Sequence, residues 1–253
     1  MSIFWVLTRR ELASYFFSLT GYVIIGAITF LTGASFLQLI SGLGNDALPM
    51  PVTQMFFGTF YFWMIVLLSA PVVTMRSFAL EKSSGTFETL MTAPVGDLEV
   101  VAAKFAAAFL FYAVMWLPLL ACLFLVGHFT NQPGGAGVLD AGTVTGTYLG
   151  IFLVGGYFLA FGCLTSALTR SQMVAAMMSL GFGVSQFALA WWAKSIPVSD
   201  HWQSEMWSCV DMFGQMNNFA RGAVDTRAVI FYLSTTFLFL FLTLRVVESR
   251  RWK

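Results

Sequence analysis

The sequence predicts an all-α integral membrane protein with six transmembrane helices. Of its 253 residues, 58% are hydrophobic and only 10% are charged, whereas soluble domains carry about 25% charged residues. Six charge-free runs are each long enough to cross a bilayer, because about 20 apolar residues at 1.5 Å rise span roughly 30 Å of hydrocarbon. Runs of this length exclude a β-barrel. The six predicted spans are residues 19–40, 52–75, 105–126, 144–168, 173–193 and 228–244.

The first eighteen residues precede these spans as a separate element. Five large apolar residues recur there at helical spacing: Phe4, Leu7, Leu12, Tyr15 and Phe16. Thr8 and Glu11 lie on another side of the same helix. This pattern predicts an amphipathic helix in the inner membrane interface, with a cytoplasmic extension of the first span as the alternative.

The distribution of Lys and Arg predicts the orientation. With the N-terminus inside, the inner segments hold ten of these residues and the outer segments three, as the positive-inside rule favours. Both termini are then cytoplasmic. The chain is expected to form a single transmembrane domain that divides into an interfacial helix (1–18), spans 1 and 2 (19–75), a cytoplasmic region (76–98), spans 3 to 5 (99–193), an outer segment (194–227), and span 6 with a tail (228–253).

Several features inside the spans predict packing. Pro71 and Pro118 each remove a helical hydrogen bond and are expected to bend spans 2 and 3. Gly142, Gly146 and Gly150 form overlapping GxxxG patterns, which allow a close helix approach without naming a partner. The outer segment is rich in aromatic residues and Met, so we expect short helices there that bury this apolar surface.

The charged region between spans 2 and 3 predicts a short helix over residues 84–92. Phe87, Leu90 and Met91 form an apolar patch at i, i+3 and i+4. Gly85 stands in an N-cap relation to Glu88, and Pro94 ends the helix. The spacing fits an apolar knob that docks into a groove on another protein and fits a solvated loop equally well.

Several residue types and motifs that other classes of membrane protein need are missing from the sequence. The predicted spans carry no Asp, Glu, Lys, Arg or His away from their ends, which argues against a proton-driven carrier, a self-contained channel or an intramembrane hydrolase. The spacing of Cys and His fits no metal motif. The sequence has no GxxxxGK[ST] motif, so any ATP that drives this protein is expected to bind another polypeptide.

The cytoplasmic region resembles that of ABC-2 type transporter permeases. The residues that carry the resemblance are Arg76, Ala79, Glu81, Gly85, Thr86, Glu88, Leu90, Pro94 and Lys104. The stretches RGAVDTR at 221–227 and ESRRW at 248–252 are similar to the gliding-motility-type (GldF-like) branch. Leu80 stands where an acidic residue is frequent, and Ala103 where Gly often precedes the Lys, so contacts at Leu80 are expected to differ.

The resemblance implies a permease subunit of the bacterial inner membrane that has no catalytic, cofactor or metal site of its own. A separate ATP-binding cassette ATPase, in two copies, would bind ATP and Mg. It would act on a coupling helix whose contact residues are Arg76, Glu81, Lys82, Gly85, Thr86, Phe87, Glu88, Leu90, Met91 and Pro94. A second permease half, identical or similar, would complete a dimer, with a periplasmic accessory subunit as a possible addition and no nucleic-acid partner.

The function implied is export of an amphipathic or hydrophobic cargo, because the spans are uncharged and rich in aromatic residues. The alternative is an ATP-driven mechanical or assembly component that acts on periplasmic partners without bulk transport.

Overall fold

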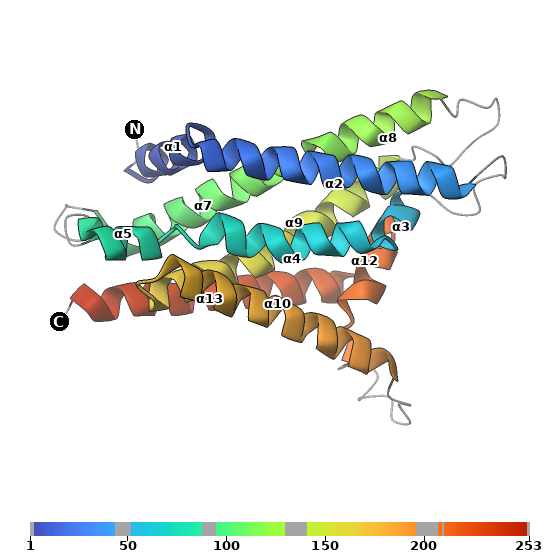
Figure 1. Ribbon diagram of the computed structural model, residues 1–253. Coiled ribbons are helices and arrows are strands. Elements are labelled where there is room, and N and C mark those ends of the chain that lie inside the picture. The colour runs from blue at the N-terminus through green and yellow to red at the C-terminus, as the bar shows by residue number, and fades with distance from the viewer. Residues whose placement is uncertain are drawn as a thin grey trace.

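The computed structural model describes residues 3–43, 52–87, 95–129, 141–195, 207–208 and 210–251, and within these ranges the chain is helical with short turns. Six helical stretches are long and apolar enough to cross a membrane, which confirms the predicted fold class. They run side by side, and both termini lie at the same end of the bundle (Figure 1). The helices are α1 (Ile3–Phe16), α2 (Leu19–Leu43), α3 (Val52–Phe57), α4 (Phe60–Thr74), α5 (Ala79–Ser84), α7 (Asp97–Met115), α8 (Leu117–Phe129), α9 (Ala141–Leu168), α10 (Gln172–Ser195), α12 (Met212–Ala220) and α13 (Thr226–Arg251).

Helix α9 is the centre of the bundle. It contacts α4, α7, α10, α12 and α13, and it is the most deeply buried of the six spans. Two of its glycines allow a close approach to α12. A Cβ on Gly146 would lie 2.5 Å from the Phe219 carbonyl oxygen, and a Cβ on Gly150 would lie 3.0 Å from the Met216 sulfur. The GxxxG pattern therefore packs α9 against α12.

The predicted second span is two helices instead of one. Helix α3 ends at Phe57, and α4 begins at Phe60 after Thr59, whose backbone is extended. The Thr53 hydroxyl donates to the Ala220 carbonyl at 3.1 Å, which holds α3 against α12. The prediction of one span over 52–75 was wrong at its start, because this tertiary contact has no periodic signal. Helix α4 continues through Pro71 to Thr74.

The third span is interrupted where a bend was expected. Helix α7 ends at Met115 and α8 begins at Leu117, one residue before Pro118, so Trp116 lies in a turn between them. The Trp116 carbonyl accepts a hydrogen bond of 2.9 Å from the Tyr148 hydroxyl of α9. The same carbonyl accepts from the Leu119 N–H at 3.2 Å, so the interruption is bonded both to the following turn and to α9.

The outer segment contains the expected buried short helix. In α12, the side chains of Met212, Met216 and Phe219 are all buried. Asp211 caps the helix by accepting from the Gly214 N–H at 3.1 Å. Residues 196–206 of the same segment lie outside the described part of the chain.

Candidate functional site

The connector that follows α4 is fixed to the end of α9 by one serine. The buried Ser166 hydroxyl accepts from the backbone N–H groups of Phe78 and Ala79 at 3.0 and 3.1 Å, and donates to the Met75 carbonyl at 3.3 Å. The first N–H groups of a helix have no partner within it, so this side chain from another helix replaces a local cap. Nearby, the Lys82 ammonium donates to the Ala167 carbonyl.

Helix α5 lies earlier in the chain than the predicted coupling helix. It covers Ala79–Ser84 and ends at Gly85, whose φ of +76° is the left-handed conformation that favours glycine. Gly85 therefore closes α5, and it also directly precedes the next helical residues, where an N-cap was predicted. Helical backbone resumes at Thr86 and Phe87. Glu88, Leu90, Met91 and Pro94 lie outside the described residues.

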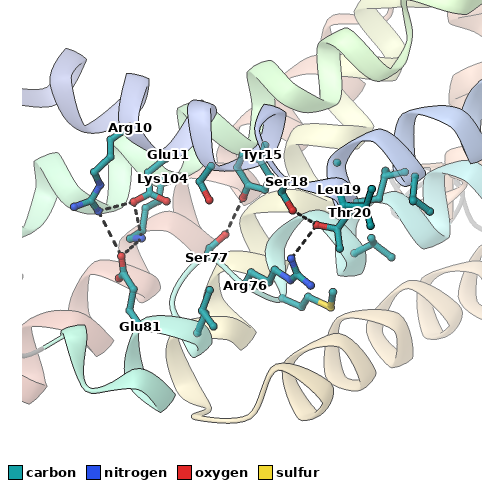
Figure 2. Close-up of a pocket in the computed structure, with 17 residues that line it drawn as sticks. Arg10, Glu11, Tyr15, Ser18, Leu19, Thr20, Arg76, Ser77, Glu81 and Lys104 are labelled. Atoms are coloured by element: carbon teal, nitrogen blue, oxygen red, sulfur yellow. Dashed lines mark hydrogen bonds and ion pairs between the residues drawn. The ribbon is translucent and has the colours of Figure 1, made fainter.

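A buried lysine joins α5 to α1 and α7. The Lys104 ammonium on α7 lies 2.7 Å from Glu81 Oε1 on α5 and 3.1 Å from Glu11 Oε1 on α1, and its side chain is only 3% exposed. Arg10 completes the network at 2.7 Å from Glu11 and 3.5 Å from Glu81 (Figure 2). Three segments distant in sequence thus meet through four charged side chains.

The positive charges of this network favour the ionised form of the Glu11 carboxyl group. Burial alone would raise the pKa of the Glu11 carboxyl group, but the Lys104 charge and the hydrogen bonds from Arg10 and Lys104 outweigh it and hold that pKa below its ordinary value. Glu11 and Thr8 were expected on a side of the first helix other than its apolar side. Glu11 is partly buried and points at Lys104, and Thr8 is fully buried. The polar side of this helix therefore contacts the protein.

Phe87 does not form an exposed knob. Its side chain is 7% exposed and packs with Phe78, Val101 and Val247 in a small core at this end of the bundle. The Lys82 ammonium lies 5.2 Å from the centre of its ring. Phe87, the member of the predicted apolar patch that the structure describes, therefore faces the protein's own interior, because neighbouring helices supply a core that periodicity does not reveal.

The outward face of the region consists of small residues. Ser83, Ser84, Gly85 and Thr86 are all exposed. Leu80 is also exposed, but it lines a cavity beside α1. The structure thus gives the region two sides: Glu81, Lys82 and Phe87 anchor it inward, and the four small residues face away from the bundle. Arg76 lies beside α2, where its guanidinium donates to the Thr20 hydroxyl at 2.9 Å.

Sequence reasoning missed the residues that hold this site together. Arg10 and Ser166 were not selected, and Glu11 was noted only as a polar residue of the first helix. Lys104 was noticed only through the family pattern. A cation at the membrane end of a span is the one signal that could have found the network, since such a charge needs an acidic partner once it is buried. Across the described residues, His, Cys, Asp and Glu side chains form no group of three that could hold a metal.

The comparison with known families bears on this arrangement. The family model described as "ABC-2 family transporter protein" matches residues 7–194, which is well over half of the chain.

The chain belongs to the ABC-2 transporter family.

The match includes every residue of the four-member charged network, as well as Ser166 and the whole of α5. An ABC-2 permease is the membrane component of a transporter, has no ATPase site of its own, and works with an ABC ATPase. No curated protein sequence matches the chain.

Proposed function

We propose that this ABC-2 permease is one half of an exporter and that the ATPase docks on the outward face of the α5 region. The observation that carries this proposal is the two-sided anchoring of α5. Its inner side is bonded to α9 through Ser166 and to α1 and α7 through Glu81 and Lys104. Its outer side, from Ser83 to Thr86, contacts no other helix closely enough to be buried.

Such anchoring suits the transmission of force. A partner that displaces α5 must also move α1, α7 and α9, or break hydrogen bonds and ion pairs between buried groups, which is costly. Rigid elements with two arrangements are how a nucleotide-driven change in one subunit is coupled to another. Helix α9 then carries the displacement into the centre of the bundle, because it contacts most of the other spans.

The remaining parts of the proposal follow from the family and the charge distribution. Two ATPase copies bind ATP and Mg, and a second permease half, identical or similar, completes the transporter. The surplus of Lys and Arg at the end that carries the termini supports an orientation with α5 and both termini in the cytoplasm, beneath a bacterial inner membrane. The gliding-motility-type branch is the subgroup that the C-terminal stretches at 221–227 and 248–252 favour.

The docking face is tested by substitutions that leave the inward anchors intact. Ser83→Arg and Thr86→Arg each place a bulky cation on the outward face. We expect both to reduce co-purification of the ATPase and transport-linked ATP turnover. The matched control is Ser249→Arg, which alters an exposed serine of α13 at the same end of the bundle. If all three variants recruit ATPase like the wild type, α5 is not the docking face.

The cargo is tested by reconstitution. We propose an amphipathic or hydrophobic cargo, and ATP-dependent flux of a fluorescent phospholipid in vesicles holding only permease and ATPase would support export. ATP turnover without flux, which appears only with a periplasmic partner and changes that partner's conformation, would favour the mechanical function instead.

A further inference from the structure

A cavity opens beside the charged network, at the end of the bundle that carries both termini. Its volume is about 570 Å³, and it lies between α1, the start of α2, and the segment from the end of α4 into α5 (Figure 2). Ligand sites commonly measure roughly 300–1,000 Å³. The cavity is therefore large enough for a headgroup with its glycerol, though not for an entire lipid.

The two ends of the cavity differ in charge. At one end Arg10, Glu11, Glu81 and Lys104 form the network described above, in which two cations match two carboxylates. At the other end lies Arg76, which has no carboxylate partner among the described residues. The charged residues that line the cavity thus leave an excess of one positive charge, and that charge is on Arg76.

The guanidinium of Arg76 has unused capacity to bind an anion. Its Nη1 donates to the Thr20 hydroxyl, and Thr20 in turn shares a hydrogen bond with the Ser18 hydroxyl. A guanidinium has five N–H donors in a planar fork that matches phosphate oxygens. One hydroxyl proton is used in the bond between Ser18 and Thr20, so this pair adds one further donor beside the fork, and the polar end is equipped for a phosphate group.

The rim of the same cavity is apolar and faces outward. Leu19 is 81% exposed and Val23 is 63% exposed, and both belong to the first transmembrane helix. Residues at the start of a span lie at the level where headgroups meet acyl chains. A ligand with its anionic group at Arg76 would therefore lay an acyl chain along α2.

We propose that this cavity binds the phosphate headgroup of a phospholipid-like amphiphile from the leaflet on the side of the termini. That this is the inner leaflet rests on the proposed orientation. Binding itself needs neither the ATPase nor transport, so it can fail or succeed independently of the proposed function.

The test uses the full-length permease, purified in detergent and stripped of lipid, with binding measured by native mass spectrometry. Phosphatidylglycerol is the probe, and diacylglycerol with the same acyl chains is the control that lacks phosphate. Inorganic phosphate alone distinguishes a lipid headgroup from a free anion. We expect tight binding of one phosphatidylglycerol molecule and at least tenfold weaker binding of the other two.

Two variants test the location. Arg76→Gln should weaken phosphatidylglycerol binding by about tenfold, the size expected for one charge-assisted contact. Arg170→Gln removes an exposed arginine in the turn between α9 and α10, outside the cavity, and should leave the affinity unchanged. Val72→Phe fills part of the cavity without changing any charge and should also weaken binding.

Three results would overturn the proposal: equal binding of diacylglycerol, equal binding of inorganic phosphate, or an equal loss of affinity in Arg76→Gln and Arg170→Gln. The last result would mean that phosphatidylglycerol is held by general surface charge. Thermal unfolding without lipid verifies that each variant is folded before its affinity is compared.

Discussion

Replacing Lys104 by methionine tests whether the charged network holds α1 and α5 in place. Methionine retains the length and apolar stem of the side chain but removes the ammonium group. Glu11 and Glu81 then lose their shared cation. Their oxygens lie within about 6 Å of each other, because the same nitrogen is 3.1 Å from one and 2.7 Å from the other.

The expected loss of stability in Lys104→Met follows from these distances. Two carboxylates about 5 Å apart repel by about 3 kcal/mol at an effective dielectric of 20. Removal of one partner from a buried ion pair costs about 3–5 kcal/mol in measured cases. Arg10 remains beside both acids and offsets part of the repulsion. We therefore expect Lys104→Met to lower the free energy of unfolding by about 3 kcal/mol.

The assay is unfolding of the purified permease in detergent, titrated with a denaturing surfactant. Arg170→Met removes an exposed cation at the same end of the bundle and is the control, with an expected change near zero. Combining Lys104→Met with Glu11→Gln and Glu81→Gln removes the stranded charges and should restore most of the loss. If Lys104→Met is as stable as the wild type, or the triple variant is no better than the single one, the network does not hold these helices.

Three further predictions concern other contacts. Ser166→Ala leaves two buried N–H groups without an acceptor and should lower the free energy of unfolding by about 1–3 kcal/mol. It should also speed hydrogen exchange at the amides of Phe78 and Ala79. The control Ser185→Ala, on an exposed surface, should change neither quantity. Gly146→Ala should lower the free energy of unfolding by about 1–3 kcal/mol, because the new Cβ would collide with α12. Gly181→Ala, whose Cβ would meet open space, should leave it unchanged. Equal unfolding midpoints for the two variants would refute the close approach of α9 and α12. The lowered pKa of Glu11 stabilises the folded state at pH values above the ordinary pKa of a glutamate, and this contribution is lost as the pH falls through the lower folded-state pKa. Below about pH 4.5, the unfolding temperature should therefore fall less steeply with decreasing pH in Glu11→Gln than in the wild type. Identical slopes for the two proteins would contradict the ion pair.

The pattern of long apolar runs was enough to predict six spans and a helical fold. Bilayer thickness and the need to pair every backbone group leave few alternatives for such runs. The interruptions within the predicted second and third spans were harder to predict. The separation of α3 from α4 falls at Gly58 and Thr59, which are a weak local signal for a helix boundary. The packing of α3 against α12, through the bond from Thr53 to Ala220, has no such signal.

The sequence alone determined that this chain has six runs able to cross a membrane, carries no P-loop motif, and has a biased distribution of Lys and Arg. Only the tertiary structure decided which residues of the α5 region face outward. Helical spacing predicted Phe87 as a knob, but residues of α7, α9 and α13 enclose it. Glu11 and Lys104 are separated by two whole spans, so no periodicity could pair them. Their pairing depends on how the helices pack, because a buried ammonium group is stable only where packing brings acidic partners to it.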